Sequence, residues 1–276
     1  MPSLEIGGRT LSWREAGEGP PALLLHCSLA HSGAWAGVMA RLSGHLAMRA
    51  PDLPGHGATT HDPAVPTQDE ALADALRLLE GQAPAHVIGH SFGGTVALRL
   101  AAEHPGRVAS LTLFEPVQFS LLAETDPEAH AQERRDAAEA LEAALDEDWE
   151  TAARAFLDRW GTPWESLPTE RAASIMKVLP LTLESNLCLL DPAVARIRPD
   201  DLGRIRCPVL LLAGGASPPV VRRINAVIAS RIPGARSLSL PGVDHMGPIT
   251  HPDRVADAIL DMIAPGSVRH ARPCGG

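Results

Sequence analysis

Short apolar runs alternate with amphipathic segments along the first 116 residues of this chain. The apolar runs have the length of buried strands, and the segments between them repeat their apolar residues at helical spacing. In the segment 67–80, for example, Leu72, Leu76 and Leu79 recur at i, i+4 and i+7. Strands that alternate with helices in this way predict an α/β fold, with a mostly parallel, twisted sheet and helices on both of its faces.

This first part should contain six strands and three helices. The predicted strands are Ser3–Ile6, Thr10–Arg14, Ala22–His26, His45–Ala50, Ala85–His90 and Val108–Phe114. The predicted helices are Ser32–Leu42, Thr67–Glu80 and Phe92–Glu103. Gly7-Gly8 is a turn dipeptide, so the first two strands should pair as a hairpin. Thr67 and Glu70 have the spacing of a capping box at a helix start.

The pattern changes between residues 117 and 203, where the segments are mostly helical. We predict helices there at Glu128–Leu145, Asp148–Trp160, Glu170–Val178 and Leu181–Leu190, with Pro180 dividing the last two. The α/β pattern then resumes, with strands Pro208–Ala213 and Ala235–Leu240 and helices Pro219–Arg231 and Pro252–Ile263. The chain should therefore form a core domain from residues 1–116 and 204–264, a helical cap from residues 117–203 over the carboxyl edge of the sheet, and a tail from 265–276.

Charge and cysteine content narrow the classes of partner. The formal net charge is -9, and the 24 Lys and Arg residues form no dense cluster, which argues against nucleic-acid binding. None of the four cysteines, Cys27, Cys188, Cys207 and Cys274, belongs to a CxxC pair, so we expect no metal site. The N-terminal residues lack the apolar region of a signal peptide, and the longest apolar runs are too short for a membrane span. We expect a cytoplasmic protein with a small-molecule substrate and no membrane partner, while its oligomeric state stays open.

The segment Gly89-His90-Ser91-Phe92-Gly93 fits the pattern G-x-S-x-G between a predicted strand and a predicted helix. In that context the serine occupies a sharp, strained turn that presents its hydroxyl at the edge of the sheet. The flanking glycines remove side chains that would collide in so tight a turn. Ser91 is therefore the predicted nucleophile, and the side chain of His90 should point away from the site.

A serine hydroxyl is a weak nucleophile and needs a general base. His245 lies after the last predicted strand in a Gly- and Pro-rich loop, the position expected for the base in this chain order. The reaction also needs N–H donors that stabilise an oxyanion. Phe92 follows the nucleophile and supplies one, and Ser28, in the loop after the strand Ala22–His26, is our choice for the second.

Four motifs together resemble the α/β-hydrolase fold superfamily, and its capped small-molecule members most closely. They are Leu23–Ser28, Asp52–Gly57 (DLPGHG), Gly89–Gly94 (GHSFGG) and Val243–Pro248 (VDHMGP). The resemblance spans about residues 3 to 264, interrupted by the cap. It implies a cofactor-free serine hydrolase with Ser91 as nucleophile, His245 as base, and Ser28 and Phe92 as oxyanion donors.

The triad acid departs from this pattern. The family usually carries it a few residues after the strand that is Val209–Ala213 here, but this chain reads Gly214-Gly215-Ala216-Ser217. Glu115 ends the strand after the nucleophile helix, where some family members resemble this chain and carry their acid. An unpaired carboxylate there would be costly, which favours Glu115 as the acid that orients His245. Asp244 is badly placed to reach the ring of its own neighbour.

These residues predict an esterase-like hydrolase that cleaves a small, apolar carboxylic ester through an acyl-enzyme. The candidate substrate-binding residues are Phe119, Leu121, Trp160 and Met246. Hydrolysis of a lactone, a thioester or a carbon–carbon bond stays open, because the same constellation serves all of them. Ser217 at the usual acid position also leaves open a non-catalytic small-molecule receptor of the same fold.

Overall fold

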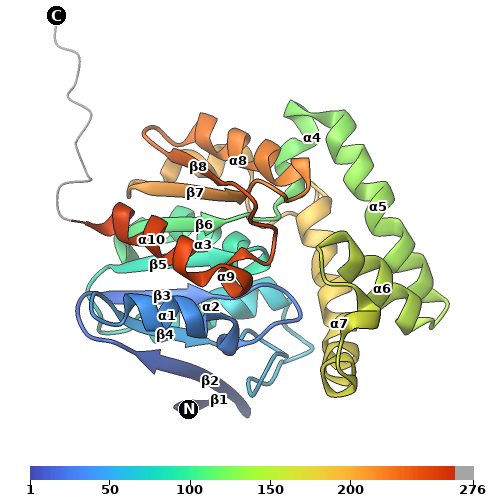
Figure 1. Cartoon of the computed structure of the whole chain (residues 1–276), viewed down its shortest axis with the longest axis horizontal. Helices are drawn as coiled ribbons and strands as arrows, with labels where there is room; N and C mark the ends of the chain where they lie inside the picture. Colours follow the sequence, from blue (N-terminus) through green and yellow to red (C-terminus); the bar gives the residue numbers. More distant parts are fainter. Residues whose placement is uncertain (265–276) are drawn as a thin grey trace, which may run out of the picture.

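A mostly parallel sheet of eight strands forms the centre of the molecule in the computed structural model, which describes residues 1–264 (Figure 1). Strands β3 to β8 are parallel to one another, and β1 and β2 extend one edge as an antiparallel hairpin around Gly7-Gly8. The predicted fold class is confirmed. The predicted tail, residues 265–276, lies outside the described residues. In spatial order the strands are β1 (Ser3–Ile6), β2 (Arg9–Ala16), β4 (Ala47–Pro51), β3 (Pro21–Leu25), β5 (Ala85–His90), β6 (Val108–Phe114), β7 (Val209–Gly214) and β8 (Arg236–Leu240).

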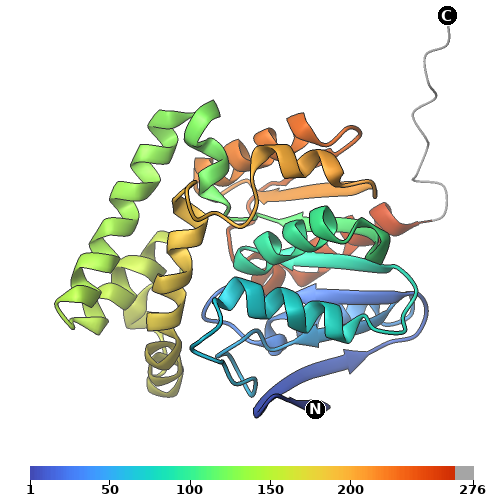
Figure 2. The ribbon, with the colours of Figure 1, turned by 180° about the vertical axis from the view of Figure 1, so that it is seen from behind.

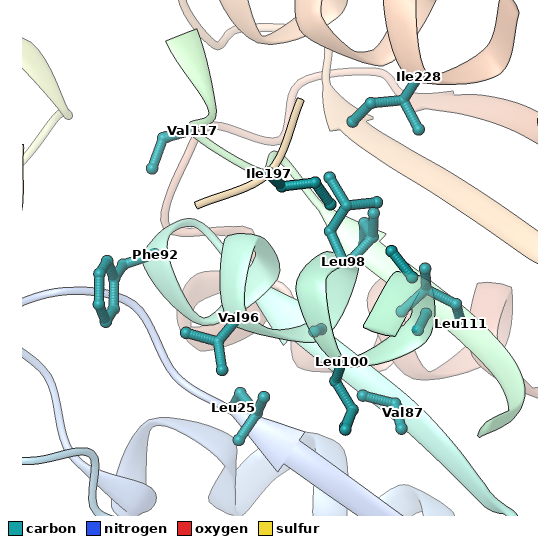
Figure 3. Packing of buried hydrophobic residues seen from close by; sticks show 14 of the residues in the cluster. Leu25, Val87, Phe92, Val96, Leu98, Leu100, Leu111, Val117, Ile197 and Ile228 are labelled. Carbon is teal, nitrogen blue, oxygen red and sulfur yellow. The ribbon is translucent and has the colours of Figure 1, made fainter. Parts of the chain in front are cut away.

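The two faces of the sheet bury alternate residues of each central strand, as the two-residue period of a strand requires. In β3, Leu23 and Leu25 join one hydrophobic cluster, whereas Ala22 and Leu24 join another on the opposite face. The first cluster lies under α2 (Thr67–Leu78), α3 (Phe92–Glu103) and α8 (Pro219–Arg231), and Figure 3 shows its packing around α3. The second lies under α1 (Ala36–Leu42) and α10 (Pro252–Ile263), and Figure 2 shows the molecule from the side opposite to these two helices.

The chain between β6 and β7 forms a helical layer beside the carboxyl ends of the parallel strands (Figure 1). Leu29, from the loop after β3, packs into the small apolar core of this layer with Leu157, Ile175 and Leu183. The layer therefore covers the edge at which β5 and β6 end. Its elements are η3 (Phe119–Leu121), α4 (Leu122–Thr125), α5 (Pro127–Leu145), α6 (Trp149–Arg159), η4 (Trp164–Ser166) and α7 (Thr169–Leu190). The next element, η5 (Pro199–Arg204), packs on α3 and α8.

Two local predictions were wrong. Residues 169–190 form one helix, α7, rather than two helices separated by Pro180. Pro180 is exposed, while Ile175 and Leu183 on either side of it pack into the same core and keep both halves on one axis. The capping box at Thr67 does not form, because Pro66 is the N-cap and Glu70 binds Arg9 and His61 instead.

Helix α7 differs from the expectation that the longest apolar runs are too short to cross a membrane. By length and composition alone, Thr169–Leu190 is long and apolar enough to do so. A single helix of this kind is weak evidence, because a core helix of a globular domain passes the same test. Here Ile175, Leu179 and Leu183 on α7 contribute to the apolar core of the helical layer.

Candidate active site

Ser91 occupies the turn between β5 and α3 with a backbone that side chains rarely adopt. Its φ is 54° and its ψ is -119°, outside the helical and extended regions. A Cβ on Gly89 would lie 2.5 Å from the carbonyl oxygen of Gly93, and a Cβ on Gly93 would collide with the carbonyl oxygens of Leu25 and His26. The two glycines thus permit the close approach of backbones that raises Ser91 above the end of the sheet.

A chain of hydrogen bonds runs from Ser91 through His245 to Glu115. The Nε2 atom of His245 lies 3.1 Å from the Oγ atom of Ser91. The Nδ1 atom of the same ring lies 2.6 Å from the Oε2 atom of Glu115. A carboxylate can only accept, so Nδ1 carries the hydrogen and Nε2 is left to accept the proton of the Ser91 hydroxyl. All three side chains are buried.

Glu115 directly follows β6, and its backbone adopts an unusual conformation. Its φ is 49°, in the left-handed region. The side chain is fully buried, and its Oε1 atom accepts a hydrogen bond of 2.5 Å from the backbone N–H of Gly214 at the end of β7. Both carboxylate oxygens therefore have a donor, which offsets the cost of burying the charge.

Neither Asp244 nor Ser217 takes the place of Glu115 beside His245. Asp244 accepts a hydrogen bond of 3.0 Å from the backbone N–H of Met246. Ser217, where the family usually has its acid, is buried, and its hydroxyl has no hydrogen-bond partner among the described residues. The structure thus brings Glu115, and not Asp244, against the imidazole.

Two buried histidines, His26 and His90, support the loops around the site, a role that the sequence did not predict. The side chain of His90 packs against His245, and its Nε2 atom lies 2.8 Å from the carbonyl oxygen of His245. His26 donates from Nδ1 to the carbonyl oxygen of Cys27 at 2.7 Å and accepts at Nε2 from the N–H of Leu53 at 2.9 Å. Burial lowers the pKa of both rings well below the ordinary value, so both stay neutral. Their position at the ends of apolar runs is the signal that could have identified them.

The two expected oxyanion donors lie close to Ser91, Phe92 as the next residue and Ser28 in the lining of the same pockets. Phe92 begins α3, and its side chain is buried in the hydrophobic core (Figure 3). Ser28 lines the cavity on both sides of Ser91. The neighbouring Leu29 has a φ of 59°, and its N–H donates to the Nε2 atom of His56 at 3.1 Å, which fixes the loop. Burial raises the pKa of the Cys27 thiol in this loop to about 12, so it is not a competing nucleophile.

Two small pockets, of about 50 and 60 Å³, meet at Ser91. Trp160 and Phe156 line both pockets, Phe119 lines the first, and Met246 lines the second. Leu121, a further expected substrate-binding residue, is wholly buried in the core and lines neither pocket, because η3 turns it inward. Among residues 1–264, no group of three or more acidic, histidine or cysteine side chains could hold a metal ion.

Comparisons with known proteins identify the family of this chain. Residues 22–258 match the model of the alpha/beta hydrolase family. A pimeloyl-[acyl-carrier protein] methyl ester esterase from Chromobacterium violaceum is 32% identical over 252 residues, which is 90% of this chain and 95% of that protein.

Solved structures share the fold over nearly the whole chain. A hydrolase from Pseudomonas aeruginosa PA01 has a TM-score of 0.74 and 25% identity, with 96% of this chain and 98% of that one covered. The enol-lactonase from Burkholderia xenovorans LB400 has a TM-score of 0.72 and 24% identity, with coverages of 95% and 99%. This chain belongs to the alpha/beta hydrolase family and is an enzyme that acts on ester bonds.

Proposed function

We propose that this protein is a serine carboxylesterase that cleaves small esters through an acyl-enzyme on Ser91. The observation that carries the proposal is the continuous hydrogen-bond chain Ser91–His245–Glu115. It pairs a hydroxyl with an imidazole in the tautomer that can accept its proton, next to a carboxylate that fixes this tautomer.

The reaction has two steps. His245 takes the proton of Ser91 as the serine oxygen attacks the ester carbonyl, and the N–H groups of Ser28 and Phe92 bind the oxyanion. Collapse of this intermediate expels the alcohol, which receives the proton from His245 and leaves an acyl group on Ser91. Water then attacks the acyl-enzyme with His245 as base, and the carboxylic acid is released. Glu115 stabilises the imidazolium in both steps.

The pockets favour a small, mainly apolar ester. Both are small, with volumes of about 50 and 60 Å³. Their linings include the side chains of Phe119, Phe156, Trp160 and Met246. The name of the Chromobacterium violaceum relative points to a methyl ester, whose alcohol would fit either pocket. A methyl ester is therefore the first class of natural substrate to test.

The test separates hydrolysis from the covalent step. We expect the wild type to hydrolyse p-nitrophenyl acetate and butyrate, and Ser91→Ala to lose this activity. Rapid quenching of the wild type with p-nitrophenyl acetate, followed by peptide mass spectrometry, should find one acetyl group on Ser91. A fluorophosphonate should label the same residue. Hydrolysis that persists in Ser91→Ala, or an acetyl group on another residue, would contradict the proposal.

A further inference from the structure

Trp160 lies directly against the imidazole of His245. The two ring centroids are 4.3 Å apart, and the ring planes are inclined by 37°, which is within the range of aromatic stacking. Trp160 follows the last residue of α6 in the helical layer, whereas His245 belongs to the loop after β8. The contact therefore joins two distant parts of the chain at the ring that would take the serine proton.

The indole is fixed in this position by neighbours from its own layer. The ring of Phe119 lies 6.3 Å from it, centroid to centroid, and the Arg159 guanidinium lies 5.4 Å from its centroid. Arg159 is itself paired with Glu133 and Asp136 on α5. These ion pairs compensate the charge of Arg159 and attach the end of α6 to α5. The position of Trp160 thus depends on how the helical layer is assembled.

The face of an indole attracts a cation, and Trp is the best of the aromatic side chains in this respect. His245 is neutral when it waits for the proton of Ser91 and positive once it has taken it. The Trp160 ring therefore favours the protonated state, on the ring face, while Glu115 favours it at Nδ1. This places two separate stabilising groups around the same charge.

We propose that Trp160 is a positioning residue for the reaction: it holds the His245 ring toward Ser91 and stabilises the imidazolium. This inference rests on the function proposed above. On this proposal the activity of His245 as a base depends on the helical layer, because a layer displaced from the sheet would remove the indole from His245.

Other groups around His245 bear on its protonation. Glu115 contacts it from β6, and the neutral ring of His90 approaches from β5 with its centroid 5.0 Å away. Arg171 on α7 lines the same pocket but donates a hydrogen bond of 2.6 Å to the carbonyl oxygen of Leu29. Asp244 is bound to the N–H of Met246, and Arg159 is paired with two carboxylates behind the indole. Of these groups, Arg159 contacts the indole, but its ion pairs with Glu133 and Asp136 do not involve Trp160, so we expect a shift to report the loss of the indole.

The test compares non-aromatic and aromatic replacements. Trp160→Leu and Trp160→Met keep an apolar cover but remove the π face, whereas Trp160→Phe keeps a weaker one. Phe156→Leu is the control, because Phe156 lines both pockets and makes no ring contact with His245 in the described residues. For each variant we would measure kcat and KM for p-nitrophenyl acetate across the acidic pH range.

Loss of the indole should lower the pKa of the acidic limb, since it stabilised the protonated ring. We expect Trp160→Leu and Trp160→Met to lower this pKa by about 0.4 to 1.5 units and kcat by about 2- to 30-fold. Trp160→Phe should show a smaller shift in the same direction, and Phe156→Leu should change KM alone. A change confined to KM in the non-aromatic variants would overturn the proposal, because Trp160 would then only line the pocket.

A second measurement does not depend on catalysis. The His245 imidazole can be titrated by NMR in Ser91→Ala and in Ser91→Ala/Trp160→Leu, and the double variant should have the lower pKa. Equal pKa values in the two proteins would overturn the role of Trp160. By contrast, a wild type that neither hydrolyses esters nor reacts with a fluorophosphonate would contradict the proposed function, while the NMR titration would still decide whether the indole stabilises the protonated ring.

Discussion

Replacement of Glu115 by Gln tests the least conventional member of the proposed triad. The change keeps the size of the side chain and removes its charge. In the native protein Oε1 accepts from the N–H of Gly214 and Oε2 accepts from Nδ1 of His245. Gln has only one oxygen. If that oxygen stays on Gly214, the amide NH₂ faces His245, and the imidazole must turn its Nδ1 into an acceptor.

That tautomer is the wrong one for the reaction. The ring hydrogen would move to Nε2, which lies 3.1 Å from the hydroxyl of Ser91 and could no longer accept its proton. In a serine protease, the corresponding change from carboxylate to amide lowers kcat about 10⁴-fold. We expect Glu115→Gln to lower kcat by about 10³- to 10⁴-fold, which corresponds to about 4 to 5.5 kcal/mol of transition-state stabilisation.

The assay is the hydrolysis of p-nitrophenyl acetate, with thermal unfolding to show that the variant folds. Glu70→Gln is a matched control, because Glu70 is also a buried carboxylate with several partners, which are Arg9, His61 and the N–H of Asp62, but it lies on α2 and outside the pockets at Ser91. It should leave kcat unchanged even where it lowers stability. A folded Glu115→Gln variant with the kcat of the wild type would refute the assignment, and another group would have to orient His245.

Three further predictions concern stability. Burial lowers the pKa of His56 to about 4 and the pKa values of His26 and His90 well below the ordinary value. The unfolded chain therefore binds more protons than the folded chain below about pH 6.5. The unfolding free energy should fall as the pH drops from there toward 4, by up to about 1.4 kcal/mol per pH unit for each ring. Urea unfolding between about pH 7.5 and pH 5.5 should show this loss, with a shallower slope in His56→Gln; equal slopes would count against it. Gly93→Ala should cost about 3 kcal/mol in thermal unfolding, because its Cβ meets the carbonyl oxygens of Leu25 and His26, whereas Gly106→Ala, with open space around it, should cost little. Ser217→Asp buries a second carboxylate near Gly214, which already binds Glu115, and should lower the unfolding free energy by about 1 to 3 kcal/mol. An unchanged unfolding free energy together with a higher esterase rate would show instead that an Asp at position 217 can act as the triad acid.

Where local signals agreed, the sequence predicted the fold to the residue. The strands Ala85–His90 and Val108–Phe114 and the helix Phe92–Glu103 have the predicted bounds, because each apolar run ends at a turn that the sequence also marks. Pro180 misled the prediction, since its local preference against helix was weaker than the packing of Ile175 and Leu183 on one core. The capping box predicted at Thr67 does not form for a similar reason, because Arg9, which is distant in the sequence, binds Glu70.

The site was predictable to the extent that its residues belong to contiguous motifs. Ser91 and His245 stand in such motifs, and the structure brings their side chains within hydrogen-bond distance. The supporting roles of His90 and His26 depend on backbone atoms of other segments, the carbonyl of His245 and the N–H of Leu53, which no spacing reveals. The stacking of Trp160 on His245 likewise depends on the position of the helical layer over the sheet.

The sheet order explains how an acid on β6 can replace one on β7. The two strands are neighbours, paired in register at Phe114 and Leu212, so their carboxyl ends open on the same point. The N–H of Gly214, at the end of β7, reaches the carboxylate of Glu115, at the end of β6, and this carboxylate reaches His245. An imidazole in the loop after β8 can therefore be oriented from either strand without a change in its own position. What the exchange requires is a backbone at Glu115 with a φ of 49°, which turns the side chain across the end of β7, and a small uncharged residue at position 217. On this reasoning Ser217 is the counterpart of Glu115 rather than a defect in the site.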